Sequence, residues 1–252
     1  MNKELIKQRF KRKLNSYDEN ARIQKQMAER LIEFIPNDTE EKSDILEIGC
    51  GTGLLTKLAV NKISFSSYTA LDIVGECKDF IKTIHPEIEF VSNDIEEYIN
   101  KTDKTFDLII SNASLQWIEN LTDFAEKLFK KLNPDGKLIF STFGKENFRE
   151  IYYALGKTLN YYSLKELESK LYEYQPTIEE EVRIMAFDTP KEVLKDIRNT
   201  GVNALSQEVW TKKDLINFEK EYNAFCLNRP TLTYNPIYVF IQKKISQLGN
   251  FL

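Results

Sequence analysis

The chain has 252 residues, of which 42% are hydrophobic and 29% are charged, proportions that are typical of a globular protein and exclude a disordered chain. Its formal net charge of -4 argues against a broad, sequence-independent affinity for nucleic acid. No apolar run approaches the ~18 residues that cross a bilayer, and the basic residues 1–13 lack the apolar core of a signal peptide, so a cytoplasmic protein without a membrane partner is expected.

The first predicted element is helical and covers residues 3–35. Its apolar side chains recur at helical spacing, at Ile6, Phe10, Leu14 and Tyr17. Pro36-Asn37-Asp38 ends the pattern. Because Tyr17 lies on the apolar stripe, we expect residues 1–35 to form lid helices that close over a binding site.

Strands and helices then alternate from residue 43 to residue 143. Short apolar runs predict strands at residues 44–48, 68–72, 88–91, 106–110 and 137–141. Helices are expected between them, at residues 54–62, 76–84, 95–100 and 118–132. This alternation predicts a doubly wound α/β fold, in which a mostly parallel sheet carries helices on both faces.

The pattern changes after residue 143. We expect a helical cap over residues 146–180, a strand over 181–187, helices over 190–199 and 212–225, and a final strand over 231–243. Pro236 lies within the final strand, which predicts an edge position or a bulge. The seven strands then belong to one Rossmann-like domain over residues 1–252, with a cofactor-binding core at 43–143 and a C-terminal part at 181–245.

A glycine-rich loop, Glu47-Ile48-Gly49-Cys50-Gly51-Thr52-Gly53, follows the first strand. Glycines at this spacing let the backbone turn sharply and approach a ligand closely. The loop ends a strand and opens a helix, which is where a doubly wound sheet binds ligands. Asp72 ends the second strand, where a carboxylate can accept both hydroxyls of a ribose. Together these residues predict a nucleoside site.

The acid that precedes the glycines distinguishes between nucleosides. Glu47 would repel a pyrophosphate but suits a cationic ligand, and the G-x-G-x-G spacing differs from the G-x-G-x-x-G of dinucleotide sites. S-adenosylmethionine carries a sulfonium and an amino group. The loop therefore predicts a methyltransferase that uses S-adenosylmethionine. A dinucleotide oxidoreductase and a tight turn without a ligand are the alternatives.

Two further segments end predicted strands at the same edge of the sheet. Asp94 follows the third strand and can bond an adenine amino group, or cap the next helix, or do both. The segment Ser111-Asn112-Ala113-Ser114-Leu115-Gln116-Trp117 ends the fourth strand and should face the methionine end of the cofactor, although Trp117 is equally well explained by packing. The predicted cofactor-binding residues are Glu47, Gly49, Cys50, Gly51, Gly53, Asp72, Ile73, Asn93, Asp94, Ile95, Ser111 and Asn112.

The chain offers few candidates for a catalytic base, nucleophile or metal ligand. Cys50, Cys77 and Cys226 are far apart and form no CxxC pair, and with the single histidine they give no metal-ligand spacing. That histidine, His85, precedes Pro86 in a predicted loop. We therefore expect reduced cysteines and no metal, and His85 is the only candidate if the chemistry needs a histidine base.

Several segments of the chain resemble the malonyl-[acyl-carrier protein] O-methyltransferases of biotin synthesis, a family of class I methyltransferases. The glycine loop is common to that whole class. The more particular segments are Leu115-Gln116-Trp117, Thr200-Gly201-Val202-Asn203-Ala204 and Leu232-Thr233-Tyr234. Phe10, Tyr17-Asp18-Glu19-Asn20-Ala21, Phe140-Ser141-Thr142-Phe143-Gly144 and Ile197-Arg198-Asn199 also resemble the family. Asn235-Pro236 departs from it, because a histidine-like or apolar pair is expected there.

The resemblance implies that the free carboxylate of a malonyl thioester is methylated, an early step of biotin synthesis. A carboxylate is already ionised at neutral pH, so the absence of a base is expected. An arginine fork is then needed to position the anion. Arg198 is the first candidate, followed by Arg149, Arg22 and Arg183, and Tyr17 is a further positioning candidate.

The resemblance also implies a partner, an acyl carrier protein carrying a malonyl group, or malonyl-CoA in its place. Acyl carrier proteins are acidic, and the N-terminal stretch holds Lys3, Lys7, Arg9, Lys11, Arg12 and Lys13 against one acid. This face either docks the carrier or is an ordinary solvated helix face. The remaining alternatives are a methyltransferase for another small acid or a quinone-like ring, and a cofactor-binding protein without catalysis.

Overall fold

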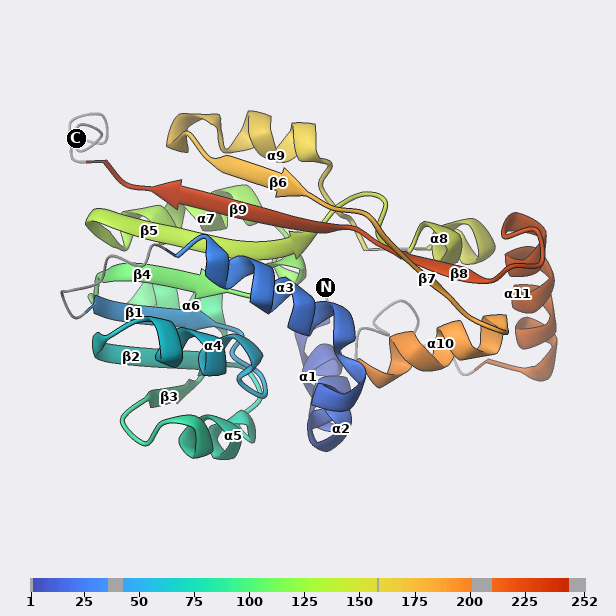
Figure 1. Ribbon diagram of the computed structural model, residues 1–252, viewed down its shortest axis with the longest axis horizontal. Helices are drawn as coiled ribbons and strands as arrows, with labels where there is room; N and C mark the ends of the chain where they lie inside the picture. Colours follow the sequence, from blue (N-terminus) through green and yellow to red (C-terminus); the bar gives the residue numbers. More distant parts are fainter. Residues whose placement is uncertain (1, 36–42, 158, 201–209, 245–252) are drawn as a thin grey trace.

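A seven-stranded sheet forms the centre of the protein, in the order β3-β2-β1-β4-β5-β9-β6 (Figure 1). The structure, a computed structural model, describes residues 2–35, 43–157, 159–200 and 210–244. The first five strands are parallel, and they are β1 Ser43–Ile48, β2 Phe65–Asp72, β3 Glu89–Ser92, β4 Phe106–Ser111 and β5 Leu132–Phe143. β9 Pro236–Gln242 runs antiparallel to both β5 and β6 Thr177–Glu180. The predicted doubly wound, mostly parallel sheet of seven strands is confirmed.

The strand order reverses at β1. Ile45 of β1 pairs with Tyr68 of β2 on one side and with Leu108 of β4 on the other. The chain therefore winds outward in both directions from this strand, to β2 and β3 on one side and to β4 and β5 on the other. In open α/β sheets this switch point is where ligands bind.

Two hydrophobic clusters cover the two faces of the sheet. One packs the sheet against α3 Arg22–Glu33, α4 Leu54–Lys62 and α5 Cys77–Ile84. The other packs it against α6 Ile95–Lys101, α7 Leu121–Lys130 and α9 Leu164–Lys170. Because both faces are covered, the central strands have continuous apolar runs instead of alternating ones.

The N-terminal residues form three helices, whereas the apolar stripe predicted one continuous helical segment. They are α1 Lys3–Lys11, α2 Leu14–Asn20 and α3. Ala21, between α2 and α3, leaves the helical region with ψ 48 and is fully buried. Neither break between these helices contains a proline or a glycine, so the sequence gives no local signal for where the helices end. Figure 1 shows α1 and α2 beside the carboxyl ends of the parallel strands. The predicted stop at Pro36-Asn37-Asp38 lies outside the described residues.

A group of elements extends beyond the carboxyl edge of the sheet in Figure 1. It contains α8 Arg149–Leu155, α10 Pro190–Asn199, α11 Lys212–Phe225 and a two-stranded ribbon of β7 Arg183–Ala186 and β8 Thr231–Tyr234. The predicted helical cap at 146–180 is only partly right, because β6 within it is the edge strand of the main sheet. Within the described ranges, no helix is long and apolar enough to span a membrane.

The predicted final strand, 231–243, is two strands that belong to different sheets. The expectation that the proline strand lies at an edge is wrong, since β9 is flanked by β5 and β6. Pro236 is the first residue of β9, where a missing N–H costs little, and its carbonyl still accepts a bond from Glu181 N at 2.9 Å. Asn235 lies between the two strands and is fully buried, and its side chain accepts a bond from Glu146 N and donates one to the carbonyl of Glu181.

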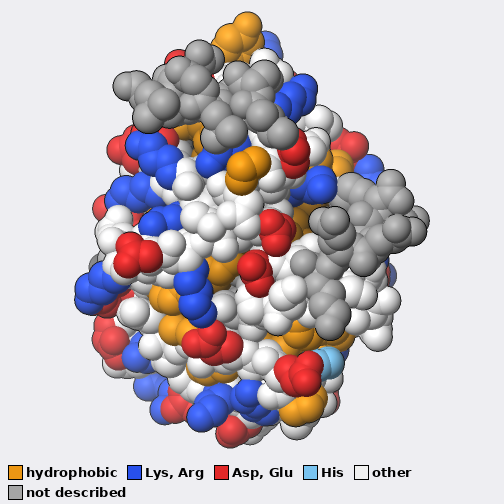
Figure 2. Space-filling model, turned by 90° about the vertical axis from the view of Figure 1, so that its left-hand side faces the viewer, with side chains coloured by type: hydrophobic (Ala, Val, Ile, Leu, Met, Phe, Trp, Pro, Cys, Tyr) orange, Lys and Arg blue, Asp and Glu red, His pale blue; other side chains and the backbone are white. Residues whose placement is uncertain are grey.

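The side of the molecule that Figure 2 shows lies at the amino ends of the parallel strands. Basic and acidic side chains alternate there, with small apolar areas between them. This side of the described chain therefore presents no large surface of one charge.

Candidate functional site

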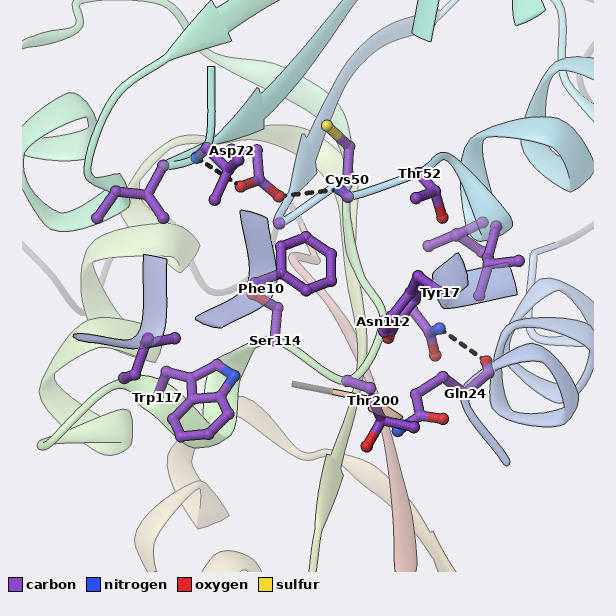
Figure 3. A pocket seen from close by; sticks show the side chains of 18 of the residues that line it. Phe10, Tyr17, Gln24, Cys50, Thr52, Asp72, Asn112, Ser114, Trp117 and Thr200 are labelled. Atoms are coloured by element: carbon purple, nitrogen blue, oxygen red, sulfur yellow. Dashed lines mark hydrogen bonds between the residues drawn. The ribbon is translucent and has the colours of Figure 1, made fainter. Parts of the chain in front are cut away.

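A cavity of about 120 Å³ lies at the carboxyl ends of β1, β2 and β4, at the switch point of the sheet (Figure 3). We call it the switch-point cavity. The strand side of its wall comes from the glycine loop, from residues 72–74 and from residues 112–117. α1, α2 and α3 close the opposite side with Ile6, Lys7, Phe10, Tyr17 and Gln24, and Thr200 completes the wall.

The glycine loop takes a backbone conformation that side chains disfavour. Gly49, Gly51 and Gly53 have φ values of +66°, +52° and +83°. Gly53 also begins α4, and a Cβ there would lie 2.2 Å from Ile84 Cδ1 of α5. A side chain at this third glycine is disfavoured by its positive φ and would displace the end of the Ile84 side chain, and the glycine does not line the switch-point cavity.

Asp72 places a buried carboxylate in the wall of the cavity. Its two oxygens accept bonds from Gly51 N at 2.9 Å and from Val74 N at 2.8 Å (Figure 3). These bonds hold the carboxylate in one orientation. Burial raises the pKa of Asp72. The arrangement suits a ligand that offers two neighbouring hydroxyl donors.

Glu47 is a second buried carboxylate in the same wall. It accepts bonds from Tyr68 Oη at 2.6 Å and Thr56 Oγ1 at 2.7 Å. Burial raises the pKa of Glu47 to about 7, against the opposing effect of these two bonds. A cation in the cavity would favour the ionised form.

The β4 side of the cavity is neutral and firmly held. Asn112 donates to the carbonyl of Gln24 at 2.9 Å and accepts from Ser141 Oγ at 2.7 Å. Gln116 donates to the carbonyl of Ala113 at 2.6 Å, and its buried Oε1 has no hydrogen-bond partner among the described residues. This end of the cavity therefore offers amide groups but no charge.

The predicted cofactor-binding residues separate into two groups. Those in the cavity wall are Glu47, Gly49, Cys50, Gly51, Asp72, Ile73 and Asn112. Those outside it are Gly53, Asn93, Asp94, Ile95 and Ser111. Ser111 is buried and donates to the carbonyl of Ile48 at 3.0 Å, so it links β4 to β1.

Asp94 has two partners within the chain. It caps α6, where its side chain accepts from the N–H groups of Glu96 and Glu97. Lys3 of α1 pairs with it at 2.8 Å. Burial raises the pKa of Asp94, but the bond and charge of Lys3 and the bonds from the Glu97 and Glu96 N–H groups together outweigh this effect and leave the pKa below its usual value. The helix-cap interpretation is confirmed, and a contact with adenine stays a prediction.

The first helix covers the glycine loop. Phe10 lies against Gly51 and meets Tyr17 edge to face, with 5.0 Å between ring centroids. Lys3 and Lys11 attach α1 to the core through ion pairs with Asp94 and Glu76. At least two of the six N-terminal cations, Lys3 and Lys11, are thus paired within the described chain, which leaves less charge for docking an acidic carrier.

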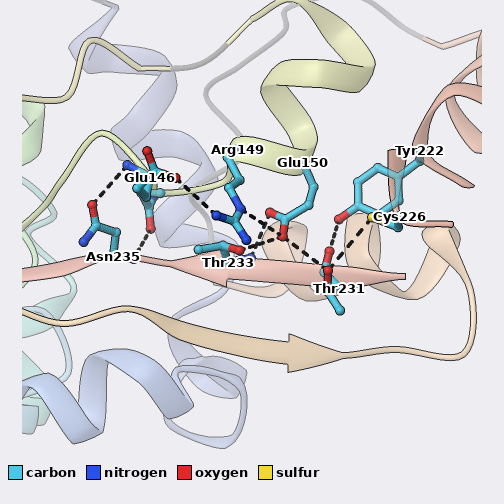
Figure 4. Close-up of polar contacts among 9 residues, drawn as sticks. Glu146, Arg149, Glu150, Tyr222, Cys226, Thr231, Thr233 and Asn235 are labelled. Atoms are coloured by element: carbon cyan, nitrogen blue, oxygen red, sulfur yellow. Dashed lines mark hydrogen bonds and ion pairs between the residues drawn. The ribbon is translucent and has the colours of Figure 1, made fainter. Parts of the chain in front are cut away.

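The four candidate arginines lie in different places. Arg198 is exposed, outside the switch-point cavity, two residues before Thr200. Arg149 is held near Glu146, at 3.3 Å, and near the buried Glu150, at 3.9 Å (Figure 4). Arg22, the first residue of α3, and Arg183, the first residue of β7, line one shallow pocket.

Glu150 explains why Arg149 stays in this position. Its carboxylate accepts from Thr233 N at 2.9 Å and from Thr233 Oγ1 at 2.6 Å, which fastens α8 to β8 (Figure 4). Since a buried carboxylate needs a nearby counter-charge, Arg149 has a structural task. This weakens the case for Arg149 as a substrate ligand.

The remaining reactive side chains are remote or buried. His85 packs edge to face on Phe65, at the end of α5 away from the cavity. Cys50 lines the cavity, and burial raises the pKa of its thiol. All three cysteines are free thiols.

Several wall residues were not predicted. Phe10, Gln24 and Thr200 come from segments far from the glycine loop in sequence, whereas Thr52 lies within the loop itself. The i, i+7 spacing of Phe10 and Tyr17 was the available signal for the lid side. Nothing local marks Gln24 or Thr200, and residues 201–204 of the segment that resembles the family lie outside the described residues.

Residues 17–181 match a family model described as a methyltransferase domain. The chain is 38% identical over 231 residues to a malonyl-[acyl-carrier protein] O-methyltransferase of Calditerrivibrio nitroreducens, which covers 90% of this chain and 91% of that protein. It is 34% identical to the protein of the same name from Chlorobium luteolum, over 96% of each chain.

Solved structures share the fold. The N-methyltransferase NodS of Bradyrhizobium japonicum, in complex with S-adenosyl-L-homocysteine, superposes with a TM-score of 0.52 at 15% identity, over 94% of this chain and 98% of that one. A putative methyltransferase of Bacillus halodurans gives a TM-score of 0.60 at 12% identity, over 86% and 98%. At such identities the similarity shows the fold alone.

Proposed function

The chain belongs to the malonyl-[acyl-carrier protein] O-methyltransferase family, and we propose on this basis that it methylates the free carboxylate of a malonyl thioester. The methyl donor is S-adenosylmethionine. A carboxylate oxygen forms a bond to the methyl carbon, and the bond from that carbon to sulfur breaks. The products are a methyl ester and S-adenosylhomocysteine, and no proton is transferred. The ester hides a negative charge, as an early step of biotin synthesis requires.

The main structural support for a carboxylate substrate is the neutral β4 side of the switch-point cavity. The carboxylates of Glu47 and Asp72 are both hydrogen-bonded within the chain. The wall residues toward β4 are amides, a hydroxyl, a methyl group and an indole, from Asn112 to Trp117. Because no base lies on that side among the described wall residues, the group that accepts the methyl must already be deprotonated when it binds. A carboxylate meets this condition, because it is ionised at neutral pH.

The wall residues fit S-adenosylmethionine. We propose that Asp72 accepts the two ribose hydroxyls, that Glu47 faces the cationic amino group, and that the loop from Gly49 to Gly51 lets the backbone approach the ligand. When bound, this cofactor supplies an electrophilic methyl group next to a sulfonium. The residues of the chain then contribute orientation and the exclusion of water, which can supply roughly 7–11 kcal/mol.

Arg198 is proposed to hold one oxygen of the malonyl carboxylate and to leave the other free to react. Its support is its exposed side chain at the end of α10 and the position of Thr200, two residues later, in the cavity wall. We also propose that the reaction takes place in the cytoplasm, where the donor and acyl carrier proteins occur, and that malonyl-CoA can replace the carrier substrate.

Mass spectrometry tests the proposed function directly. Malonyl-carrier protein is incubated with the enzyme and S-adenosylmethionine, with acetyl-carrier protein as the matched control because it lacks the free carboxylate. The expected result is one added methyl group on the malonyl form and none on the acetyl form. No methylation of the malonyl form, or equal methylation of both, would contradict the proposal.

A further inference from the structure

A second and larger cavity lies next to the switch-point cavity, and we call it the α10 cavity. Its volume is about 820 Å³, which falls within the roughly 300–1,000 Å³ of sites that take small molecules. α8, α10 and α11 supply most of its wall, and Arg9 of α1 and Trp210 complete it. Figure 1 shows these three helices beyond the carboxyl edge of the sheet.

The inner wall of the α10 cavity is apolar and belongs to the core. Ile151, Ile197 and Phe218 are buried there. Ala154, Leu155, Leu194, Trp210 and Leu215 extend the apolar surface. Asn217 adds one amide. A ligand with an apolar body and some amide groups would be complementary to this wall.

Cations gather around the same cavity. They are Arg9, Lys157, Lys191, Lys195 and Arg198, against the two acids Asp214 and Glu221. Lys191, Lys195 and Arg198 follow each other at intervals of four and three residues, so they lie on one face of α10. That row is ~10 Å long at 1.5 Å per residue. The cavity therefore favours an anion.

Two members of this row are available to a ligand. Lys191 pairs with Glu219 at 2.9 Å. Lys195 and Arg198 are exposed and form no ion pair within the part of the chain that the structure describes. The available positive charge therefore runs along α10 toward its C-terminal end.

The walls of the two cavities adjoin at that end of α10. Arg198 lines the α10 cavity, and Thr200 lines the switch-point cavity. On α1, Arg9 likewise lines the α10 cavity, and its neighbour Phe10 lines the switch-point cavity. Asn199, between Arg198 and Thr200, bonds Lys13 at 3.3 Å and Asn20 at 3.1 Å, which holds α10 against α1 and α2. An elongated molecule in the α10 cavity thus points one end toward the cofactor site.

We propose that the α10 cavity binds the phosphopantetheine arm that carries the acyl group. This inference rests on the proposed function. The arm has a phosphate at one end, a dimethyl group and two amides along its length, and the thioester at the other end. The apolar wall receives the body of the arm, Lys195 attracts the phosphate, and the malonyl end passes Arg198 into the switch-point cavity. Carrier protein and coenzyme A share this arm.

A pair of substrates that differ only in the phosphate tests the role of Lys195. Malonyl-phosphopantetheine and malonyl-pantetheine are compared as substrates, and kcat and KM are measured separately. The wild type should favour the phosphorylated form by about tenfold in kcat/KM, through KM, as expected for a charge-assisted contact. Lys195→Ala should lose most of that preference. Lys220→Ala, which removes an exposed lysine of α11 outside the cavity, should keep it. An unchanged preference in Lys195→Ala would overturn the assignment of the phosphate.

A substitution that fills the α10 cavity tests the apolar wall. Ala154→Trp should raise KM for both substrates by about tenfold or more, since the arm loses its space. Cofactor affinity should stay the same, which also shows that the variant folds. Tyr153→Trp is the control, because Tyr153 is exposed on another side of α8. An unchanged KM in Ala154→Trp would show that the arm lies elsewhere.

Direct binding separates this inference from the proposed function. If the wild type methylates no malonyl thioester, the proposed function is wrong, and calorimetry with phosphopantetheine itself then decides the role of the cavity. Binding to the wild type that Ala154→Trp removes would support the cavity as the site of the arm. Absence of binding to the wild type, or equal binding to both proteins, would overturn it.

Discussion

The ring of Phe10 lies directly over Gly51, so that a methyl group added to Gly51 would come within 3.2 Å of Phe10 Cζ. This contact joins the first helix to the glycine loop across the switch-point cavity. The cavity that it closes has a volume of about 120 Å³, which is below the roughly 300 Å³ usual for ligand sites. We therefore propose that α1 moves outward when the cofactor enters.

The first prediction concerns this lid. Phe10→Ala should weaken cofactor binding about tenfold or more, because a buried aromatic contact over the ligand is lost. Gln8→Ala, an exposed change on the same helix, should have no effect. Deletion of residues 1–20 should abolish turnover and leave a folded core, as seen by circular dichroism. Full activity of the truncated protein would rule out a lid.

The second prediction concerns the ribose. Asp72→Ala should weaken S-adenosylmethionine binding by more than tenfold, since each charge-assisted bond contributes roughly 1.5–3 kcal/mol. Isothermal calorimetry measures the dissociation constant. Asp79→Ala, an exposed change on α5, is the control. A folded Asp72→Ala protein with the wild-type dissociation constant would remove Asp72 from the cofactor site.

The third prediction concerns the pH dependence of stability. Burial raises the pKa of Glu47 to about 7, compared with about 4.3 in an unfolded chain. Between these values the folded protein keeps a proton that the unfolded chain has released, so the free energy of unfolding falls as pH rises from about 4 to 7. Glu47→Gln cannot titrate and should lack this part of the decline.

Urea denaturation at pH 5 and pH 8 measures the difference. From pH 5 to pH 8, the free energy of unfolding should fall by on the order of 2–4 kcal/mol less in Glu47→Gln than in the wild type, at 1.36 kcal/mol for each unit of pKa shift. The amide oxygen of glutamine still accepts from Tyr68 and Thr56, which keeps the local structure comparable. Parallel stability curves for the two proteins would show that Glu47 is already ionised at pH 5.

The fourth prediction concerns the substrate arginine. Arg198→Ala should lower kcat/KM for malonyl-carrier protein more than tenfold, because an anion in a partly buried site loses its partner. Arg198→Lys should restore little, since a point charge does not reproduce a planar fork. Cofactor affinity should not change.

Arg149→Ala is the informative comparison for Arg198. Because Arg149 lies beside the buried Glu150, its removal should lower the unfolding temperature by several degrees, whereas Arg198→Ala should not. A normal rate in Arg198→Ala would transfer the substrate role to Arg149, Arg22 or Arg183. Loss of cofactor binding in Arg198→Ala would indicate a structural role for the end of α10.

The sequence alone was sufficient for the elements whose signals are local. The apolar runs and the breaks between them predicted all five parallel strands, and α4, α10 and α11 have the predicted bounds. The glycine loop and Asp72 could be placed at one edge of the sheet, because the carboxyl ends of parallel strands meet there. The acid before the glycines indicated a cationic ligand.

Only the tertiary structure decided features that depend on distant partners. Gly53 lies outside the switch-point cavity, Asp94 is paired with Lys3, and β9 lies inside the sheet although it begins with Pro236. Arg198 lines the α10 cavity, and the packing of α1 against α10 places that cavity beside the switch-point cavity. Strand order, cavity walls and ion pairs join residues far apart in the chain. Local periodicity reports which face of an element is buried, and the partner that buries it is set by packing of the whole chain.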